Sequence, residues 1–319
     1  MDALKTARAR HLLSINDLSD VDLAYILERG VDFARDRRPS SLPLAGDIVG
    51  VFFEKTSTRT RTAFSSGALR LGARVITYGP GDLQTNTGEN LADTGQVLAG
   101  MLDVLVARTV LTADRLAELA AQPDMAVVNA MNVEEHPTQA LTDLTTLLRH
   151  FGRIEGLRVL YVGEGNNTAS ALALALSRFR GVELELRTPP GYGLAEQFHD
   201  VVADQSKRYD SSVVERHDMA NLPRGFDVVY TSRWQTTGTT KPDADWRTIF
   251  APFQVHSGLW ESSPRAVFMH DLPAHRGEEV TADVLDGPAS IAFAQATNKL
   301  HSAMAVLDWC QAGRGGFGA

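Results

Sequence analysis

The hydrophobic positions of the chain fall into short apolar runs that alternate with longer amphipathic segments. In the first half the runs are DIVGVFFEK, VITYG, DVLVAR and AVVNAM, and each predicts a short buried strand. Between them, stretches such as STRTRTAFSSGALRLGA begin with polar capping residues and continue with helical spacing. This alternation of strand and helix predicts a parallel sheet covered by helices.

One amphipathic segment precedes the first strand. Residues 15–35 have helical apolar spacing, and five side chains are available for one face: Leu18, Val21, Leu23, Ile26 and Leu27. We therefore expect a helix across this segment.

The alternation pauses after residue 135 and then resumes. HPTQALTDLTTLLRHFG predicts a linking helix over residues 136–150. GLRVLYVGEGNN predicts a strand followed by a Gly/Asn turn, and TASALALALSRFRG predicts a helix. VELELRT, FDVVYTS and AVFMHDLP predict three more strands, and a last helix is expected over about residues 289–311.

The predicted fold class is α/β, with two doubly wound parallel-sheet domains. A chain of 319 residues is long enough for two domains of ordinary size. We place the first domain at residues 1–135 and the second at residues 151–285. Residues 136–150 link them, and the C-terminal helix is expected to pack back on the first domain.

Composition places the chain among globular proteins. Hydrophobic residues make up 44% and charged residues 22%. The single cysteine, Cys310, excludes a disulfide framework within one chain and a multi-cysteine metal site, and it fits a reducing compartment. The N-terminal segment lacks the features of a secretory signal, and no apolar run reaches the roughly 20 residues needed to cross a bilayer. We expect a cytoplasmic protein with no membrane partner.

Charge argues against a nucleic-acid partner. The formal net charge is −8, and basic residues gather only in short stretches such as 34–38 and 57–62. An acidic total without a base-stacking motif is a poor match for nucleic-acid binding, although a local basic pocket can still hold a small anion.

The segment Ser57-Thr58-Arg59-Thr60-Arg61-Thr62 is such a local basic stretch, at a strand-to-helix junction. The first turn of a helix offers unpaired backbone N–H groups and the positive end of its dipole. Hydroxyl and guanidinium groups complete a cradle for a phosphate dianion. Spacing alone fits a capped helix with two solvated arginines equally well.

Five landmarks along the chain resemble those of the aspartate/ornithine carbamoyltransferase (transcarbamylase) family. FEKTSTRTR at 53–61 resembles the carbamoyl-phosphate signature, and Arg108 ends the strand DVLVAR. His136-Pro137-Thr138-Gln139 resembles the family's His-Pro-x-Gln. GEGNN at 163–167 and HDLPAHRG at 270–277 resemble the ornithine carbamoyltransferase branch. The order and the element types match, so the two domains would bind carbamoyl phosphate and an amino acid respectively.

The resemblance implies a carbamoyltransferase, an enzyme of amino-acid biosynthesis. An amine attacks carbamoyl phosphate, a tetrahedral oxyanion forms, and phosphate leaves with a ureido product. Positioning and electrostatics carry most of such a reaction. No metal or organic cofactor is required. GEGNN lacks the G-x-G-x-x-G spacing, so a dinucleotide site is not expected.

The resemblance also implies roles for the donor-binding residues. The phosphate would be held by Ser57, Thr58, Arg59 and Thr60. Arg108 and His136 would donate to the carbonyl oxygen, Gln139 would take the carbamoyl NH₂, and the backbone carbonyl of Leu272 would orient the NH₂ and the attacking amine. Taken alone, His136 also fits a helix cap and Arg108 a surface arginine.

Two further donor-site expectations follow from the resemblance. Lys299 stands where ornithine enzymes have the arginine of Asn-Arg-x-His. Lysine keeps the positive charge but lacks the forked pair of guanidinium donors. The family implies a homotrimer with shared active sites, in which loop 83–90 reaches a neighbour's site through Gln84.

The acceptor-binding residues depart from the ornithine pattern. The positions implied are Asn166, Asn167, Ser232, Arg233, Gln235, Thr236, Thr237, Asp271 and Leu272. Ser232 replaces the aspartate of Asp-x-Trp-x-Ser-Met-Gly, a loss of about 1.5–3 kcal/mol of charge-assisted pairing. Thr236 and Thr237 replace its Ser and Met, and Asp271 replaces the Cys of the Leu-Pro loop. Arg233 and Gln235 stand where the aspartate branch binds a carboxylate.

Three hypotheses follow for the acceptor. The first is ornithine or a related amino acid. The second keeps the donor but uses another zwitterion, such as 2,3-diaminopropionate or a specialised-metabolite amine, with its carboxylate at Arg233 and its ammonium at Asp271. The third is a non-catalytic homologue that binds an anion or a partner protein; the presence of Arg59, His136 and Gln139 argues against it.

Overall fold

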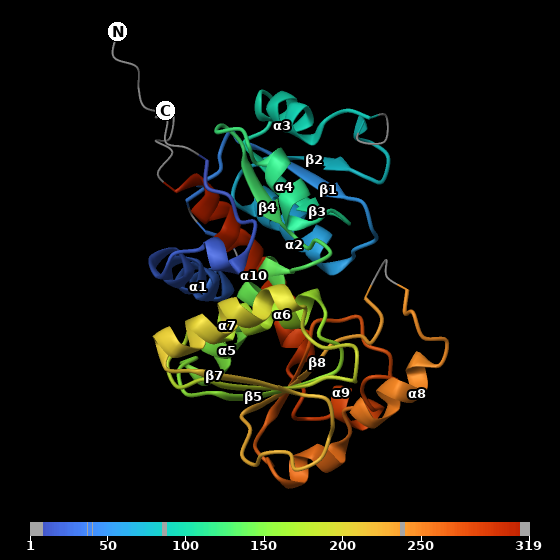
Figure 1. The fold of residues 1–319 in the computed structure, drawn as a ribbon. Coiled ribbons are helices and arrows are strands. Elements are labelled where there is room, and N and C mark those ends of the chain that lie inside the picture. Colours follow the sequence, from blue (N-terminus) through green and yellow to red (C-terminus); the bar gives the residue numbers. More distant parts are fainter. Residues whose placement is uncertain (1–8, 37, 40, 85–87, 237–239, 313–319) are drawn as a thin grey trace. The chain divides into compact units, whose positions relative to one another are not determined.

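The computed structural model describes residues 9–36, 38–39, 41–84, 88–236 and 240–312, and the chain forms two compact units (Figure 1). Unit 1 comprises Met1–Val133 and Lys299–Ala319, and unit 2 comprises Glu134–Asn298. Each unit contains one parallel sheet with helices, which confirms the predicted fold class.

The sheet of unit 1 has four strands in the order β2-β1-β3-β4, all parallel. They are β1 (Ile48–Phe53), β2 (Arg74–Tyr78), β3 (Val104–Arg108) and β4 (Ala126–Asn129). All four coincide with the apolar runs of the sequence.

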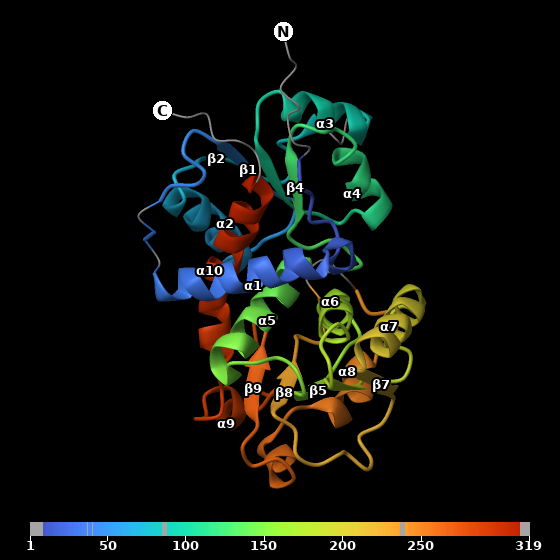
Figure 2. The same cartoon turned by 90° about the vertical axis from the view of Figure 1, so that its left-hand side faces the viewer.

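Helices cover both faces of this sheet. On one face, Leu105 and Val127 pack with leucines of α3 (Leu91–Ala99) and α4 (Ala113–Leu119). α2 (Arg59–Arg70) lies beside α10 (Ala292–Gln311), where a Cβ on Gly67 would come 3.1 Å from Met304 Cγ (Figure 2). Helices can pack on both faces because successive side chains of a strand point to opposite sides of the sheet.

The N-terminal helix starts later than the sequence predicted. Ser14 caps a short 3₁₀ turn, Ile15–Asp17, and Ser19 accepts from the backbone N–H of Asp22 to begin α1 (Asp20–Arg35). A serine at the N-cap satisfies a backbone donor that the helix itself leaves unpaired. Leu18 therefore precedes the helix, and Val21 is 79% exposed rather than on the buried face.

Residues of α10 from Lys299 onward belong to unit 1. There Asp308 accepts hydrogen bonds from Tyr25 Oη and Arg29 Nε, each at 2.8 Å, and Trp309 Nε1 donates to Asp22 at 2.8 Å. These bonds attach the end of α10 to α1. Neither α10 nor any other helix in the described part of the chain has a stretch apolar enough to cross a membrane.

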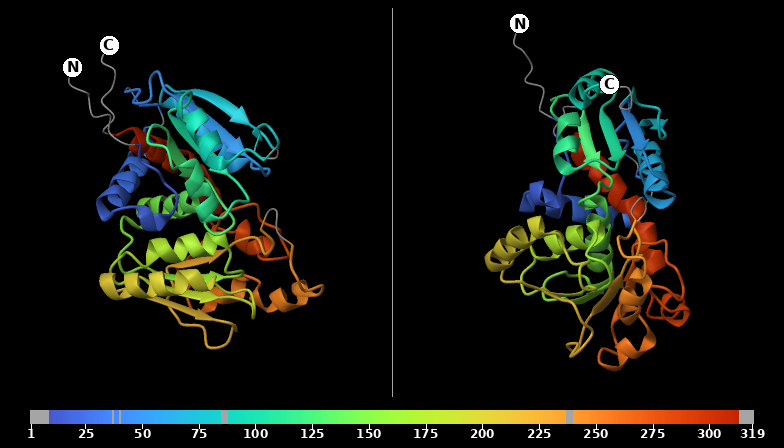
Figure 3. Two further views of the ribbon diagram at one scale, coloured as in Figure 1. Left: turned by 45° about the horizontal axis from the view of Figure 1, so that its top comes forward. Right: turned by 45° about the vertical axis from the view of Figure 1, so that its right-hand side comes forward.

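The sheet of unit 2 has five parallel strands in the order β7-β6-β5-β8-β9. Figure 3 shows the yellow-green and yellow helices of this unit lying along the sheet. They are β5 (Arg158–Val162), β6 (Glu183–Arg187), β7 (Ser212–Arg216), β8 (Val228–Thr231) and β9 (Val267–His270). The edge strand β7 was not predicted, because its sequence SVVER ends in charges and is only partly buried.

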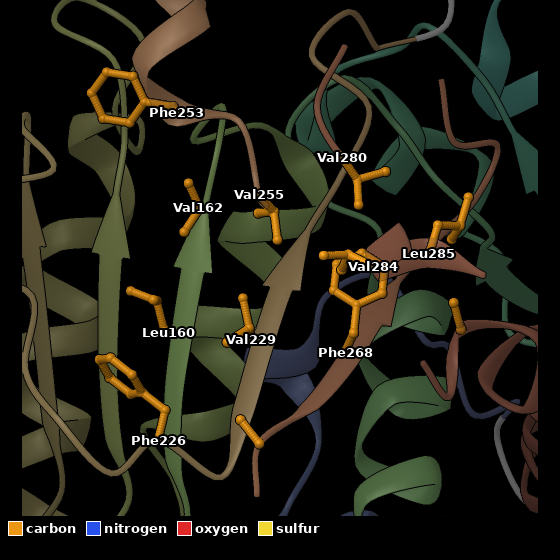
Figure 4. Packing of buried hydrophobic residues seen from close by; sticks show 12 residues of the cluster. Leu160, Val162, Phe226, Val229, Phe253, Val255, Phe268, Val280, Val284 and Leu285 are labelled. Atoms are coloured by element: carbon orange, nitrogen blue, oxygen red, sulfur yellow. The ribbon is translucent and has the colours of Figure 1, made fainter. Parts of the chain in front are cut away.

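The helices of unit 2 include α5 (Pro137–Phe151), α6 (Asn167–Leu176), α7 (Glu196–Tyr209), α8 (Trp246–Phe250) and α9 (Ala282–Leu285), and 3₁₀ turns lie at Ala251–Phe253 and Ser257–Glu261. α5 is the helix expected to link the domains, and it lies within unit 2. On one face of the sheet, Leu160, Val162, Val229 and Phe268 form a buried cluster (Figure 4). Tyr161 and Tyr230 alternate with these residues, so they point to the opposite face.

Candidate functional site

In both units most of the predicted site residues follow the carboxyl ends of parallel strands, where open α/β sheets bind their ligands. In unit 1, Phe53 at the end of β1 lies opposite Arg108 at the end of β3. The backbone N–H of Glu54 donates to the Arg108 carbonyl at 3.0 Å. The phosphate-signature segment and Arg108 are therefore on adjacent strands.

The start of α2 presents the groups that the sequence predicted for an anion site. Thr58 is the N-cap residue, but its hydroxyl makes no capping hydrogen bond. Ser57 and Arg59 are half-buried and Thr60 is buried. The backbone N–H groups of the first turn, the helix dipole and these side chains together suit a phosphate. A plain capped helix, the alternative interpretation, would use the Thr58 hydroxyl as its cap.

Two further residues predicted for the donor site belong to unit 1. Gln84 is exposed and follows Leu83, which is buried in the cluster beneath α3 and α4. Residues 85–87 of this loop lie outside the described residues. Lys299 is 7% exposed on α10.

In unit 2, the His-Pro-Thr-Gln segment starts α5. His136 is the N-cap residue and Pro137 follows at the first helical position, where a missing N–H costs nothing. The His136 ring makes no cap hydrogen bond; its Nδ1 lies 3.3 Å from Thr138 Oγ1. The backbone N–H of His136 donates to the Asn167 carbonyl at 3.1 Å. The segment therefore lies directly beside the Gly/Asn turn.

That turn needs glycine at its centre. A Cβ on Gly165 would lie 2.2 Å from the backbone carbon of Gly193, so no side chain fits there. The close approach allows the Gly165 N–H to donate to the Tyr192 carbonyl at 2.8 Å. It also sets the position of Asn166 and Asn167 at the start of α6.

Asn166 connects the turn to the end of β8. Its Oδ1 accepts from the N–H groups of Thr168 and Ala169 and so caps α6. Its Nδ2 donates to Ser232 Oγ at 3.0 Å and to Thr236 Oγ1 at 3.2 Å. Burial raises the pKa of Tyr161 well above its usual value, and its hydroxyl lies 2.7 Å from Ser232 Oγ. Ser232 thus lies in a closed polar cluster.

Asp271 lies at the end of β9. Its Oδ2 accepts from Thr168 Oγ1 at 3.0 Å, and its Oδ1 lies 3.4 Å from His270 Nδ1. The next residue, Leu272, has φ +53° and forms a cis peptide bond with Pro273. The structure therefore brings together Asn166, Asn167, Ser232, Thr236 and Asp271 with the start of α5.

Arg233 and Gln235 are half-buried on either side of Trp234, which is buried against Tyr192, Trp246 and Phe250. Thr237 lies outside the described residues.

Sequence reasoning missed an ion pair beside the turn. Lys241 Nζ pairs with Glu164 Oε1 and lies 4.8 Å from the ring centroids of both Tyr192 and Phe250. Burial lowers the pKa of Lys241, although the nearby charge of Glu164 acts to raise it. Burial raises the pKa of Glu164, although the nearby charge of Lys241 acts to lower it. The two residues are 77 positions apart, so no sequence motif joins them.

Within the described residues, no group of three or more His, Cys, Asp or Glu side chains is arranged to hold a metal ion.

Two family models match the chain. The aspartate/ornithine carbamoyltransferase carbamoyl-P binding domain matches residues 10–149, and the aspartate/ornithine carbamoyltransferase Asp/Orn binding domain matches residues 155–310. The chain belongs to the aspartate/ornithine carbamoyltransferase family. This confirms the resemblance inferred from the five landmarks.

Individual family members agree over nearly the full length. The chain is 36% identical over 303 residues to an ornithine carbamoyltransferase of Carboxydothermus hydrogenoformans, which covers 94% of this chain and 97% of that protein. It is 34% identical to the ornithine carbamoyltransferase of Bacillus subtilis, covering 93% and 92% respectively. The ornithine carbamoyltransferase structure from Pyrococcus furiosus matches with a TM-score of 0.90 at 35% identity, covering 98% and 99%. The expected class, a carbamoyltransferase of the ornithine carbamoyltransferase type, is thereby confirmed.

Proposed function

We propose that this carbamoyltransferase moves the carbamoyl group of carbamoyl phosphate to the side-chain amine of ornithine or a closely related amino acid. The observation that carries the proposal is the polar cluster of unit 2, where the turn after β5, the end of β8 and the end of β9 meet through Asn166–Ser232 and Thr168–Asp271 hydrogen bonds. Similarity to ornithine carbamoyltransferases over 94% of the chain supports the same acceptor.

In unit 1, the proposed donor-binding groups are the first turn of α2 and three more distant side chains. Ser57, Thr58, Arg59 and Thr60 bind the phosphate with backbone N–H groups and charge-assisted hydrogen bonds. Arg108 donates to the carbonyl oxygen as it becomes an oxyanion. Lys299 adds positive charge, and Gln84 contacts the phosphate of a neighbouring subunit.

In unit 2, His136 donates to the same carbonyl oxygen. Gln139 and the Leu272 carbonyl accept hydrogen bonds from the carbamoyl NH₂. The amino acid binds through Asn166, Asn167, Ser232, Arg233, Gln235, Thr236, Thr237 and Asp271. Because all these groups act by position and charge, the reaction needs no covalent intermediate.

One observation favours a second acceptor. Asp271 is a carboxylate, and the ring of His270 and the hydroxyl of Thr168 hold it in place at the edge of the sheet. A shorter diamino acid, such as 2,3-diaminopropionate, would place its ammonium there and its carboxylate at Arg233.

A panel of amines separates the two. The purified chain is incubated with carbamoyl phosphate and ornithine, lysine, 2,4-diaminobutyrate, 2,3-diaminopropionate, putrescine or aspartate, and phosphate and ureido product are measured. Ornithine as the best acceptor supports the first proposal. A preference for 2,3-diaminopropionate that disappears in Asp271→Ala and Arg233→Ala supports the second. Absence of transfer to every amine would contradict both.

We further propose a cytoplasmic homotrimer with shared active sites. Light scattering coupled to size-exclusion chromatography tests the trimer. Sharing of sites is tested by mixing an inactive Gln84→Ala chain with an inactive His136→Ala chain. Recovery of activity in mixed trimers supports sharing, and no recovery contradicts it.

A further inference from the structure

A buried carboxylate on α5 holds the amide of Gln139. Gln139 Nε2 donates to Asp143 Oδ1 at 2.7 Å, and the two residues are four positions apart, on one face of the helix. Asp143 is fully buried, with 0% of its surface exposed. A helical spacing thus places a charge beside a side chain with a proposed role in donor binding.

The same carboxylate receives two further hydrogen bonds from other elements of unit 2. Gln295 Nε2 of α10 donates to Asp143 Oδ1 at 2.7 Å, and Tyr230 Oη of β8 donates to Asp143 Oδ2 at 2.9 Å. The carboxylate therefore joins α5, β8 and the start of α10.

The chain of hydrogen bonds continues to the Leu-Pro loop. The backbone N–H of His270 donates to Gln295 Oε1 at 2.8 Å, and the backbone N–H of Leu272 donates to His270 Nδ1 at 2.8 Å. Gln139 lies at one end of this chain and Leu272 at the other, with Asp143 between them.

The chemistry of the donors determines how each amide is turned. A carboxylate only accepts hydrogen bonds, so an amide facing it must present its nitrogen. For Gln139, this directs Oε1 away from Asp143. The Gln295 amide lies between the backbone N–H of His270 and the Asp143 carboxylate. Only one orientation of this amide gives both neighbours a partner, with Oε1 toward the N–H and Nε2 toward the carboxylate.

We propose that Asp143 is a positioning residue that sets both acceptors of the carbamoyl NH₂, Oε1 of Gln139 directly and the Leu272 carbonyl through Gln295 and His270. This inference rests on the proposed function, which gives those two groups their role. An NH₂ group has two hydrogens to donate, and the two ends of the hydrogen-bond chain supply two acceptors. Asp143 therefore determines whether the site distinguishes a carbamoyl group from an acyl group of similar shape.

Acetyl phosphate provides the test, because it keeps the phosphate and the carbonyl but carries a methyl group in place of NH₂. The dissociation constants of carbamoyl phosphate and acetyl phosphate are measured by calorimetry on the full chain and its variants, together with KM and kcat. In Asp143→Leu, which keeps the branched shape of the side chain but removes the acceptors, we expect carbamoyl phosphate to bind roughly tenfold more weakly, the equivalent of one or two hydrogen bonds. Acetyl phosphate binding should change less than about twofold, because no bond to a methyl group is lost.

Three variants separate positioning from general damage. Asp143→Asn should restore discrimination, since its carbonyl oxygen can accept from both glutamines while its NH₂ donates to the Tyr230 hydroxyl. Thr145→Val, which removes another buried hydrogen bond of α5 (Thr145 Oγ1 to the Leu141 carbonyl, 2.7 Å), should leave discrimination unchanged. Gln295→Met interrupts only the branch to Leu272 and tests the proposal should Asp143→Leu fail to fold.

The outcomes are distinct. Equal weakening of both phosphates in Asp143→Leu, or unchanged discrimination in Gln295→Met, overturns the positioning role. A wild-type chain that binds both phosphates but carbamoylates no amine contradicts the proposed function, while the binding comparison still decides the role of Asp143.

Discussion

His270 Nδ1 accepts a hydrogen bond from the backbone N–H of Leu272 at 2.8 Å, and its Nε2 lies 3.2 Å from Glu279 Oε1. The ring in this arrangement carries its proton on Nε2. Burial opposes a second proton, but the hydrogen bonds and charges of Asp271 and Glu279 outweigh burial and raise the pKa of His270 above 6.5. A second proton would occupy Nδ1, which lies 3.4 Å from Asp271 Oδ1, and that nitrogen could then no longer accept from the Leu272 N–H.

We predict that kcat rises with pH as His270 loses this second proton. Glu279→Gln removes one of the two carboxylates that raise the pKa of His270, so the rise should move to lower pH. The check is the pH dependence of kcat with saturating substrates. Glu278→Gln, which alters a half-exposed carboxylate 3.4 Å from His275, is the control and should leave the profile in place.

The raised pKa of His270 also makes the free energy of unfolding depend on pH. Because the folded protein binds this proton more tightly than the unfolded chain, the stabilisation is present below pH 6.5 and is lost as pH rises through the pKa of folded His270. Urea unfolding across this range measures it. A profile of Glu279→Gln that moves to higher pH would contradict both predictions.

Lys241→Met should destabilise unit 2. The substitution leaves the carboxylate of Glu164, whose side chain is 18% exposed, without its ion-pair partner among the aromatic rings. Breaking one side of a largely buried pair leaves an uncompensated charge, and we expect a loss of about 3 kcal/mol in the free energy of unfolding, measured in urea.

The matched control is Lys207→Met, because Lys207 and Asp204 form a pair whose side chains are 80% and 79% exposed. Such pairs contribute little, so no measurable change is expected. The double variant Lys241→Met/Glu164→Gln should regain part of the lost stability. Equal effects of the two lysine substitutions would show that the buried pair has no special role.

Arg59→Ala should weaken phosphate binding. Arg59 is the first residue of α2, and Arg70 is the last. Loss of a charge-assisted hydrogen bond costs about 1.5–3 kcal/mol, so the inhibition constant of inorganic phosphate should rise at least roughly tenfold. Arg70→Ala removes the same charge at the other end of the helix and should change that constant less than twofold, within about 0.4 kcal/mol. Similar effects of both variants would indicate that phosphate responds to the overall positive charge of the helix and not to a specific site at Arg59.

Ser232→Asp should improve binding of ornithine. Ser232 already lies within hydrogen-bond distance of Tyr161 Oη and Asn166 Nδ2, so two polar groups are in place to position a carboxylate there. A new charged partner for the ornithine ammonium should lower the KM for ornithine by about tenfold. Ser232→Asn, similar in size and uncharged, is the control. An equal gain with Ser232→Asn would contradict the electrostatic explanation.

The sequence predicted those helices and strands that are marked by a pattern of consecutive residues. Buried strands such as β1 and β5 are continuous apolar runs, and α5 begins at a His-Pro pair followed by helical spacing. The phosphate-signature segment was identified because its chemistry depends on consecutive residues. The edge strand β7 and the start of α1 were missed because partial burial and a serine cap compete with the apolar spacing.

Residues that act through tertiary contacts could not be identified in the same way. Asp143 is four positions from Gln139, a spacing that hints at contact on a helix, yet its other partners, Tyr230 and Gln295, are 87 and 152 positions away. Lys241 becomes significant only because folding places it over Tyr192. In both cases the burial of a charge, which determines its effect, depends on segments that the local pattern does not connect.

The reactivity of Cys310 can report local opening at the end of α10. Cys310 is the single cysteine, and it is 1% exposed near the end of α10, next to Trp309, whose indole donates to Asp22. A thiol reagent can modify it only while that end of the helix is detached, so the labelling rate rises with the fraction of molecules in the detached state. Asp308→Asn, which weakens the attachment to Arg29, should speed the labelling by the thiol reagent in the absence of any substrate.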